Sequence, residues 1–212
     1  MVARFADRRE AGTLLGEALR ERDIGADLVL AIPRGGLPVG RAVADELAVP
    51  LDIVVAQKIG APGNPEYALG AVSSDGTVWR NEEAFVGGSV DEEYFEQQLA
   101  AKTELARQKA IRYRGSRSTA DLTGKTVVVV DDGVATGSTI KACLQTLRET
   151  AVDRVVLAVP VGPPETIHEL ERMADEVVCL ETPYGFRGVG QFYDRFDQVQ
   201  DEEAIAYLEA ET

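Results

Sequence analysis

The sequence predicts an α/β protein with an open, mostly parallel sheet, helices on both faces and an inserted flap or hood. The first observation is a set of short, continuous apolar runs such as Val127–Val130, which are typical of strands buried on both faces. The second is that helical patterns alternate with these runs, as they do when crossover helices join parallel strands. The third is the segment 58–88, where glycines, prolines and alternating residues indicate loops and a hairpin.

The elements follow one another in a regular order. Asp7 is a suitable N-cap for a first helix that presents Leu14, Leu15, Ala18 and Leu19 on one face. Strands are expected at residues 28–32, 51–56, 127–130, 155–161 and 177–180, and the other helices at 37–47, 90–114, 138–149 and 163–173. We expect one domain over residues 1–212, in which 58–88 form a flexible flap and 181–195 a late loop.

The composition is typical of a soluble globular protein, because hydrophobic residues make up 45% and charged residues 27% of the chain. No apolar run approaches the roughly 20 residues that span a membrane, and the N-terminus lacks the apolar core of a signal peptide. We therefore expect a cytoplasmic protein without a membrane partner. Cys143 and Cys179 lack metal-ligand spacing and are interpreted as buried thiols.

The net charge of −14 argues against a nucleic-acid partner, since no basic cluster stands out. Few of the basic residues are lysines, which together with the acidic excess is compatible with adaptation to high salt. A simple solvated acidic surface explains the charge equally well, and both interpretations stay open. An anionic ligand would need local donors, cations or Mg²⁺ to bind against this field, and salt would screen it.

Two adjacent carboxylates, Asp131 and Asp132, follow the apolar strand at its carboxyl end, where open α/β sheets bind ligands. A loop of small and hydroxyl-bearing residues, Gly133–Thr139, then opens into a helix. Backbone amides of such a loop can surround a phosphate, and the helix N-terminus favours an anion. The carboxylates suit vicinal sugar hydroxyls or Mg²⁺. This stretch therefore predicts a phosphosugar site.

These residues closely resemble the 5-phosphoribosyl diphosphate (PRPP) signature of type I phosphoribosyltransferases. Over about residues 4–209 the chain most resembles a group of stand-alone bacterial and archaeal phosphoribosyltransferase-like proteins, whose acceptor the sequence does not supply. It implies the fold of that family, PRPP as substrate and Mg²⁺ as cofactor. Asp131 and Asp132 would hold the ribose hydroxyls and the metal, directly or through water and PRPP. The residues that would cradle the 5′-phosphate are Ala135, Thr136, Gly137, Ser138 and Thr139.

The turn Pro33–Gly36 is the second constellation, and it lies between a predicted strand and a predicted helix. Arg34 is a forked donor suited to a diphosphate, and Gly35 and Gly36 let the backbone approach it. The turn resembles the family's pyrophosphate loop, in which a non-proline cis peptide is often seen. Arg41, one helical turn further, is interpreted as a surface cation.

The predicted flap carries the next candidates. Lys58 is expected at the end of the second predicted strand, where many family members have a basic residue that reaches the diphosphate. Glu66 and Tyr67 lie in a segment rich in glycine and proline, which can close as a lid. The resemblance thus implies Arg34, Lys58 and Glu66 as catalytic residues. A rigid turn followed by a hairpin is the alternative for this segment.

The late loop combines three glycines with four aromatic residues between 182 and 194. Phe186 and Asp194 roughly occupy the places of a stacking aromatic and an aspartate in 6-oxopurine phosphoribosyltransferases, and they are expected to bind the acceptor. A small hydrophobic cluster is the equal alternative. Ala135 stands where those enzymes have an aspartate that acts as the base, which puts 6-oxopurine chemistry by that route in doubt. His168 is expected at the surface.

The resemblance implies a Mg²⁺-dependent phosphoribosyltransferase that transfers the phosphoribosyl group of PRPP to a nitrogenous acceptor, with a nucleobase as the expected class. A non-catalytic sensor of PRPP or nucleotides is one alternative. A hydrolase that releases ribose 5-phosphate from an ester or nucleotide is another. The sequence does not identify the acceptor, and it leaves open whether the protein forms a homo-oligomer.

Overall fold

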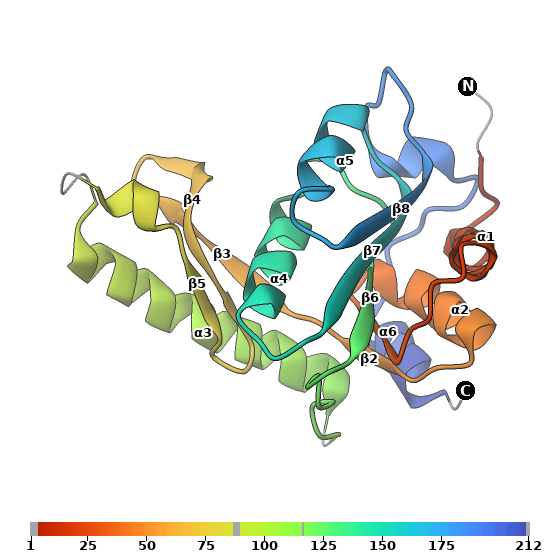
Figure 1. Cartoon of the computed structure of the whole chain (residues 1–212), viewed down its shortest axis with the longest axis horizontal. Helices are drawn as coiled ribbons and strands as arrows, with labels where there is room; N and C mark the ends of the chain where they lie inside the picture. Colours follow the sequence, from red (N-terminus) through yellow and green to blue (C-terminus); the bar gives the residue numbers. More distant parts are fainter. Residues whose placement is uncertain (1–3, 87–89, 116, 211–212) are drawn as a thin grey trace.

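The computed structural model describes residues 4–86, 90–115 and 117–210. Its centre is a five-stranded sheet in the order β2-β1-β6-β7-β8, with every neighbouring pair parallel (Figure 1). The strands are β1 (Leu28–Ala31), β2 (Leu51–Ile53), β6 (Thr126–Val130), β7 (Arg154–Val161) and β8 (Glu176–Glu181). The predicted fold class is confirmed by this sheet and by the helices that cover it.

Helices cover both faces of the sheet because alternate residues of each strand point to opposite sides. Val128 and Val130 pack in one core cluster with α1 (Arg8–Glu21) and α2 (Gly36–Leu47). Val127 and Val129 pack in the other with α4 (Ser138–Arg148), and α5 (Pro164–Leu170) lies on the same side. The C-terminal helix α6 (Asp201–Glu209) completes the first face.

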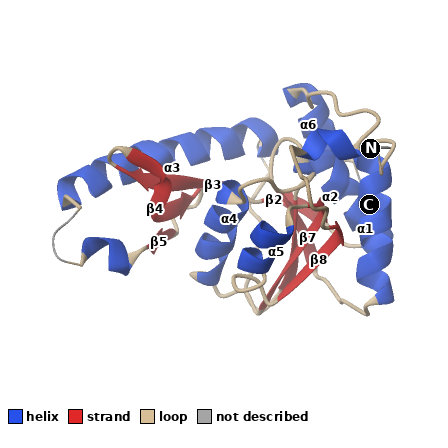
Figure 2. Cartoon of the chain, turned by 90° about the horizontal axis from the view of Figure 1, so that it is seen from above, coloured by secondary structure: helices blue, strands red, loops and turns tan. Residues whose placement is uncertain are grey.

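The flap predicted at 58–88 takes, up to residue 86, the form of a second sheet, which projects from the main body (Figure 2); residues 87 and 88 lie outside the part that the structure describes. Its strands β3 (Ala56–Ala61), β4 (Asn64–Ser73) and β5 (Val78–Arg80) are antiparallel, and a short helix, η1 (Glu82–Phe85), follows. The long helix α3 (Glu92–Arg114) runs beneath this hood. Ile59 and Leu69 pack against Phe95 of α3, so the hood has a small core of its own. A short helix, η2 (Val189–Phe192), lies in the late loop.

Several expectations from the sequence need correction. The second parallel strand ends at Ile53, and Lys58 lies inside β3 of the hood rather than at the end of the second predicted strand. Arg41 is not a surface cation: it is 7% exposed and pairs with Asp45 at 2.6 Å, because α6 covers this side of α2. Leu14, expected on the buried face of α1, is 37% exposed.

Other expectations hold. Asp7 caps α1 by accepting hydrogen bonds from the amides of Arg9 and Glu10. Cys143 and Cys179 are free thiols, the first buried and the second half-buried. His168 is exposed. Among the described residues, no helix is both long and apolar enough to cross a membrane.

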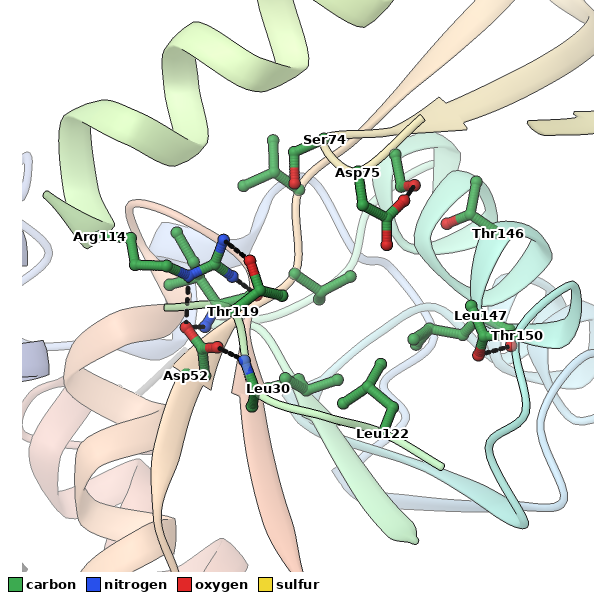
Figure 3. A pocket seen from close by; sticks show the side chains of 15 residues that line it. Leu30, Asp52, Ser74, Asp75, Arg114, Thr119, Leu122, Thr146, Leu147 and Thr150 are labelled. Atoms are coloured by element: carbon green, nitrogen blue, oxygen red, sulfur yellow. Dashed lines mark hydrogen bonds and ion pairs between the residues drawn. The ribbon is translucent and has the colours of Figure 1, made fainter. Parts of the chain in front are cut away.

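An ion pair fastens the C-terminal end of α3 to the edge of the main sheet (Figure 3). Arg114 Nε lies 2.9 Å from Asp52 Oδ1, and both side chains are about 10% exposed. Asp52 also accepts hydrogen bonds from the amides of Ile53 and Ala120, so its buried charge is well satisfied. The adjoining cavity of about 40 Å³ shares no lining residue with the acid pair or with the turn 33–36.

Candidate active site

The acid pair lies at the carboxyl end of β6, directly against the turn that follows β1. A Cβ atom built on Gly35 would lie 2.2 Å from Asp132 Oδ2, and one built on Gly36 would lie 3.2 Å from Asp131 Oδ1. Only glycine therefore fits at position 35 without displacing the carboxylate. The structure thus brings together the two motifs that the sequence singled out, although they are about one hundred residues apart in the chain.

Within the segment 133–139 the loop ends at Gly137, which is the N-cap of α4 and has a φ of 72°, and Ser138 and Thr139 are the first residues of the helix. Glycine adopts this left-handed conformation without a steric cost and has no side chain with which to cap the first amides of α4 itself. Thr136 Oγ1 and Ser138 Oγ lie 3.2 Å apart at the same end, and Ala135, Thr136 and Thr139 are exposed. Hydroxyls and helix amides that meet in this way can bind a phosphate.

Arg8 of α1 binds the second carboxylate of the pair. Its Nε lies 2.8 Å from Asp132 Oδ2, and the two side chains are 12% and 15% exposed. The guanidinium also stacks over Phe196 at 3.8 Å from the ring centroid and donates to the carbonyl of Asp197 at 2.7 Å. Tyr193 closes the network, since it stacks on Phe196 and its hydroxyl donates to the Asp132 carbonyl at 2.6 Å.

The first carboxylate of the pair lies in a different electrostatic environment. Burial, followed by repulsion from Asp132, raises the pKa of Asp131 well above its usual range. Lys109 of α3 partly offsets this effect through its charge. Burial in turn lowers the pKa of Lys109, whose Nζ donates to the carbonyl of Pro33 at 2.9 Å. Burial and then Asp131 raise the pKa of the adjacent Cys143 thiol to about 12, so this thiol stays protonated.

The turn 33–36 contains the non-proline cis peptide expected from the family, between Pro33 and Arg34. Arg34 Nη1 lies 3.1 Å from Asp201 Oδ1 of α6, and both side chains are 31% exposed. Arg112 and Tyr113 of α3 bind the same carboxylate. These groups border an open hollow of about 470 Å³ beside the turn, which is also lined by Gln57 and Lys109.

The residues that the sequence analysis assigned to the flap lie on the hood strands β3 and β4, not on the main sheet. Lys58 is on the same face of β3 as Ala56, two residues earlier, and Ala56 packs in the core cluster that contains α4. Glu66 belongs to β4, but its side chain lies outside the part of the chain that the structure describes. Tyr67 is 47% exposed.

The late loop forms the hydrophobic cluster that the sequence left as the alternative to an acceptor site. Phe186 stacks on Phe192 with ring centroids 5.7 Å apart and packs against a cluster that includes Phe5 and Tyr193. Asp194 is exposed, and its amide donates to the carbonyl of Phe5. The loop touches the site elsewhere, because Val189 packs over Gly133. An acceptor role for Phe186 and Asp194 remains a prediction.

Sequence reasoning missed four charged residues that border the site: Arg8, Lys109, Arg112 and Asp201. All four belong to helices whose local pattern is amphipathic or polar, and Arg8 and Asp201 are the first residues of theirs. No local signal separates them from solvated surface charges. Their partners in the site are far away in sequence and become visible only when the helices are packed.

Comparisons with known proteins agree with this geometry. The phosphoribosyl transferase domain family matches residues 6–193. A Mycobacterium tuberculosis protein named as a "Putative phosphoribosyl transferase" is 42% identical over 205 residues, which are 97% of this chain and 46% of the relative. The chain thus spans about half the length of the curated relatives it matches. The crystal structure of TT1426 from Thermus thermophilus is 44% identical, with a TM-score of 0.91 and 97% of each chain covered.

A parallel sheet that carries an acid pair and a small-residue loop at the carboxyl end of one strand has the arrangement of α/β proteins that bind ligands at this edge. The chain belongs to the phosphoribosyltransferase family. The family membership expected from the motif at 127–139 is therefore confirmed.

Proposed function

We propose that this protein transfers the 5-phosphoribosyl group from PRPP to a nitrogenous acceptor, with a nucleobase as the expected class, and releases diphosphate. The observation that carries this proposal is that Asp131 and Asp132 are followed, at one strand end, by the segment 135–139, in which Ala135, Thr136 and Thr139 are exposed. The carboxylates suit hydroxyls and the loop suits an anion. A sugar phosphate satisfies both at once.

Each part of the site would have its own task. The loop 135–139 would bind the 5′-phosphate, and the acid pair would accept hydrogen bonds from the ribose hydroxyls. Arg34, with the backbone of Gly35 and Gly36, would bind the diphosphate. In the reaction the C1–O bond breaks, its electron pair leaves on the diphosphate, a C1–N bond forms and the acceptor loses a proton. Positive charge develops on the ribose, so positioned carboxylates stabilise the transition state.

The donor set suits Mg²⁺. Among residues 4–86, 90–115 and 117–210, no group of three metal-ligating side chains lies together. Magnesium in proteins is commonly held by one or two carboxylates and completes its shell with water and substrate phosphates. Asp131 would supply such a carboxylate, while Asp132 Oδ2 is already bound by Arg8. When bound, the ion would neutralise charge on the leaving diphosphate.

The hood and the late loop supply the remaining proposed residues. Closure of the hood would exclude water and bring Lys58 and Glu66 towards the diphosphate and the acceptor. Phe186 and Asp194 would lie on the acceptor side. Glu66 is a candidate for the base because Ala135 cannot accept a proton.

The deciding experiment is incubation of the protein with PRPP, Mg²⁺ and a panel of bases, with diphosphate release as the readout. Wild type should release diphosphate only with a suitable acceptor. The Asp131→Asn, Asp132→Asn double variant should lose this activity and most PRPP affinity. The matched control is Glu82→Gln with Glu83→Gln, an exposed acidic pair on η1.

The outcomes separate the three functions. PRPP binding without turnover on any acceptor would support the sensor. Release of ribose 5-phosphate without an acceptor would support the hydrolase. An unchanged PRPP affinity in the Asp131, Asp132 double variant would contradict the assignment of the site itself.

A further inference from the structure

A carboxylate of the protein itself is bound by the arginine of the diphosphate loop. Asp201 Oδ1 lies 3.1 Å from Arg34 Nη1 and accepts a hydrogen bond from the Tyr113 hydroxyl at 3.0 Å. Its other oxygen, Oδ2, lies 3.1 Å from Arg112 Nη1. Two guanidinium groups and a phenol around two oxygens are also a suitable donor set for a phosphate group.

The surroundings of this carboxylate can accommodate a larger anion. Asp201 borders the open hollow of about 470 Å³ together with Arg34, Lys109 and Arg112. Lys109 adds a further cation, which is fixed beside the turn by its hydrogen bond to the Pro33 carbonyl. Three cations thus border the hollow against one carboxylate, in a chain whose net charge is −14. The local excess of positive charge favours an anion with more than one negative charge.

We infer that Asp201 is an internal competitor of the diphosphate group, which must displace it to reach Arg34 and Arg112. This inference rests on the proposed function, because it takes the diphosphate of PRPP as the anion. The exchange is feasible because Asp201 is 31% exposed and Arg112 is 64% exposed, and partly exposed ion pairs are individually weak. A diphosphate offers the same donors more charge and more oxygens.

The competition links the site to the C-terminal helix. Asp201 is the first residue of α6, and α6 packs on α2 and α3. When the diphosphate takes over the two arginines, the first turn of α6 loses its contacts with Arg34, Arg112 and Tyr113. Binding of the leaving group therefore loosens α6, whereas binding of the 5′-phosphate at residues 135–139 leaves it in place.

The test uses Asp201→Asn, which removes the charge and keeps the shape. Calorimetric titrations would use inorganic diphosphate with Mg²⁺, PRPP with Mg²⁺, and ribose 5-phosphate. We expect affinity for diphosphate and PRPP to rise by roughly three- to tenfold, and affinity for ribose 5-phosphate to stay unchanged. Glu202→Gln is the matched control, since it makes the same charge change at the next, exposed position of α6 and should alter none of the three affinities.

A diphosphate affinity that is unchanged or lower in Asp201→Asn would overturn the inference and make Asp201 a residue that orients the two arginines. Hydrogen exchange on wild type gives a second measurement. Diphosphate should speed exchange of the α6 amides and ribose 5-phosphate should not; equal protection with both would also overturn it. Failure of wild type to bind PRPP and ribose 5-phosphate would instead refute the proposed function.

Discussion

Arg8 and Arg34 each bind a carboxylate beside the same strand ends, but their surroundings differ. The Arg8–Asp132 pair is 12% and 15% exposed and is covered by Phe196, whereas the Arg34–Asp201 pair is 31% exposed on both sides and borders an open hollow. If the proposed function is right, the difference means that the ribose end of the site is held rigid and the leaving-group end is exchangeable. Rigid groups lower the cost of reaching the transition state, and exchangeable ones let product leave.

The largest expected effect on stability comes from breaking the buried ion pair between Arg8 and Asp132. Arg8→Met leaves Asp132 charged and poorly solvated next to Asp131, so the free energy of unfolding at pH 7 should fall by about 3 kcal/mol. The control is Arg195→Met, because Arg195 also pairs with an aspartate, Asp7, but is 70% exposed. It should cost less than about 1 kcal/mol. Urea denaturation of both variants is the measurement, and equal losses would mean that the two ion pairs are not held differently.

Gly35→Ala tests how closely the two motifs are packed. The added methyl group would lie 2.2 Å from Asp132 Oδ2, so the turn or the carboxylate must shift. We expect a loss of about 1–3 kcal/mol in stability and a clear loss of PRPP affinity. Gly25→Ala is the matched control, since nothing lies within 4 Å of its added atom. If both variants bind PRPP like wild type, the close contact between the turn 33–36 and Asp132 is not needed for binding.

The pH dependence of stability should differ in sign between two aspartates, Asp131 and Asp121. Because the pKa of Asp131 is raised, the native state holds its proton to higher pH than the unfolded state does. This group therefore lowers stability as the pH rises from its ordinary pKa through the raised one. Asp131→Asn should be more stable than wild type at pH 7 and lose that advantage towards pH 4.

Asp121 gives the opposite sign. Hydrogen bonding by the Thr123 amide lowers its pKa, so its contribution is present at neutral pH and lost as the pH falls through the lowered value. Asp121→Asn should therefore be slightly less stable than wild type at pH 7. Thermal unfolding between pH 4 and pH 8 measures both variants. Parallel profiles for the two would contradict the assignment of a raised pKa to Asp131.

The smallest expected effect on stability comes from the exposed ion pair between Arg112 and Asp201. Arg112→Gln removes an ion pair whose arginine is 64% exposed, so the free energy of unfolding should change by less than about 1 kcal/mol. Its affinity for inorganic diphosphate should nevertheless fall. A large loss of stability in this variant would show that the surroundings of Asp201 are as tightly packed as those of the Arg8–Asp132 pair.

The main sheet and the phosphate loop could be predicted because their signals are local. Four consecutive valines, two aspartates and a loop of small residues lie within thirteen positions, and each reports its own environment. The turn 33–36 was recognisable for the same reason. Its direct contact with Asp132 was not, since that contact depends on β1 and β6 being neighbours in the sheet.

The ion pairs of the site could not be predicted because their two partners come from distant parts of the chain. Arg8 reaches Asp132 across 124 positions, and Arg34 reaches Asp201 across 167. Arg41 shows the reverse error: its pattern is that of a surface residue, and only the packing of α6 on α2 buries it. Lys58 was assigned to the wrong strand because a short apolar run does not reveal where one sheet ends and another begins.

The ion pair between Asp52 and Arg114 fixes the C-terminal end of α3 to the main sheet. The hood lies near the other end, about 33 Å away along the helix axis, whereas Lys109 is only about 8 Å from Arg114. A rotation of α3 about Arg114 would move its hood end roughly four times as far as it moves Lys109. Any rotation of α3 about this ion pair would therefore displace the hood much further than it displaces Lys109 beside the turn 33–36.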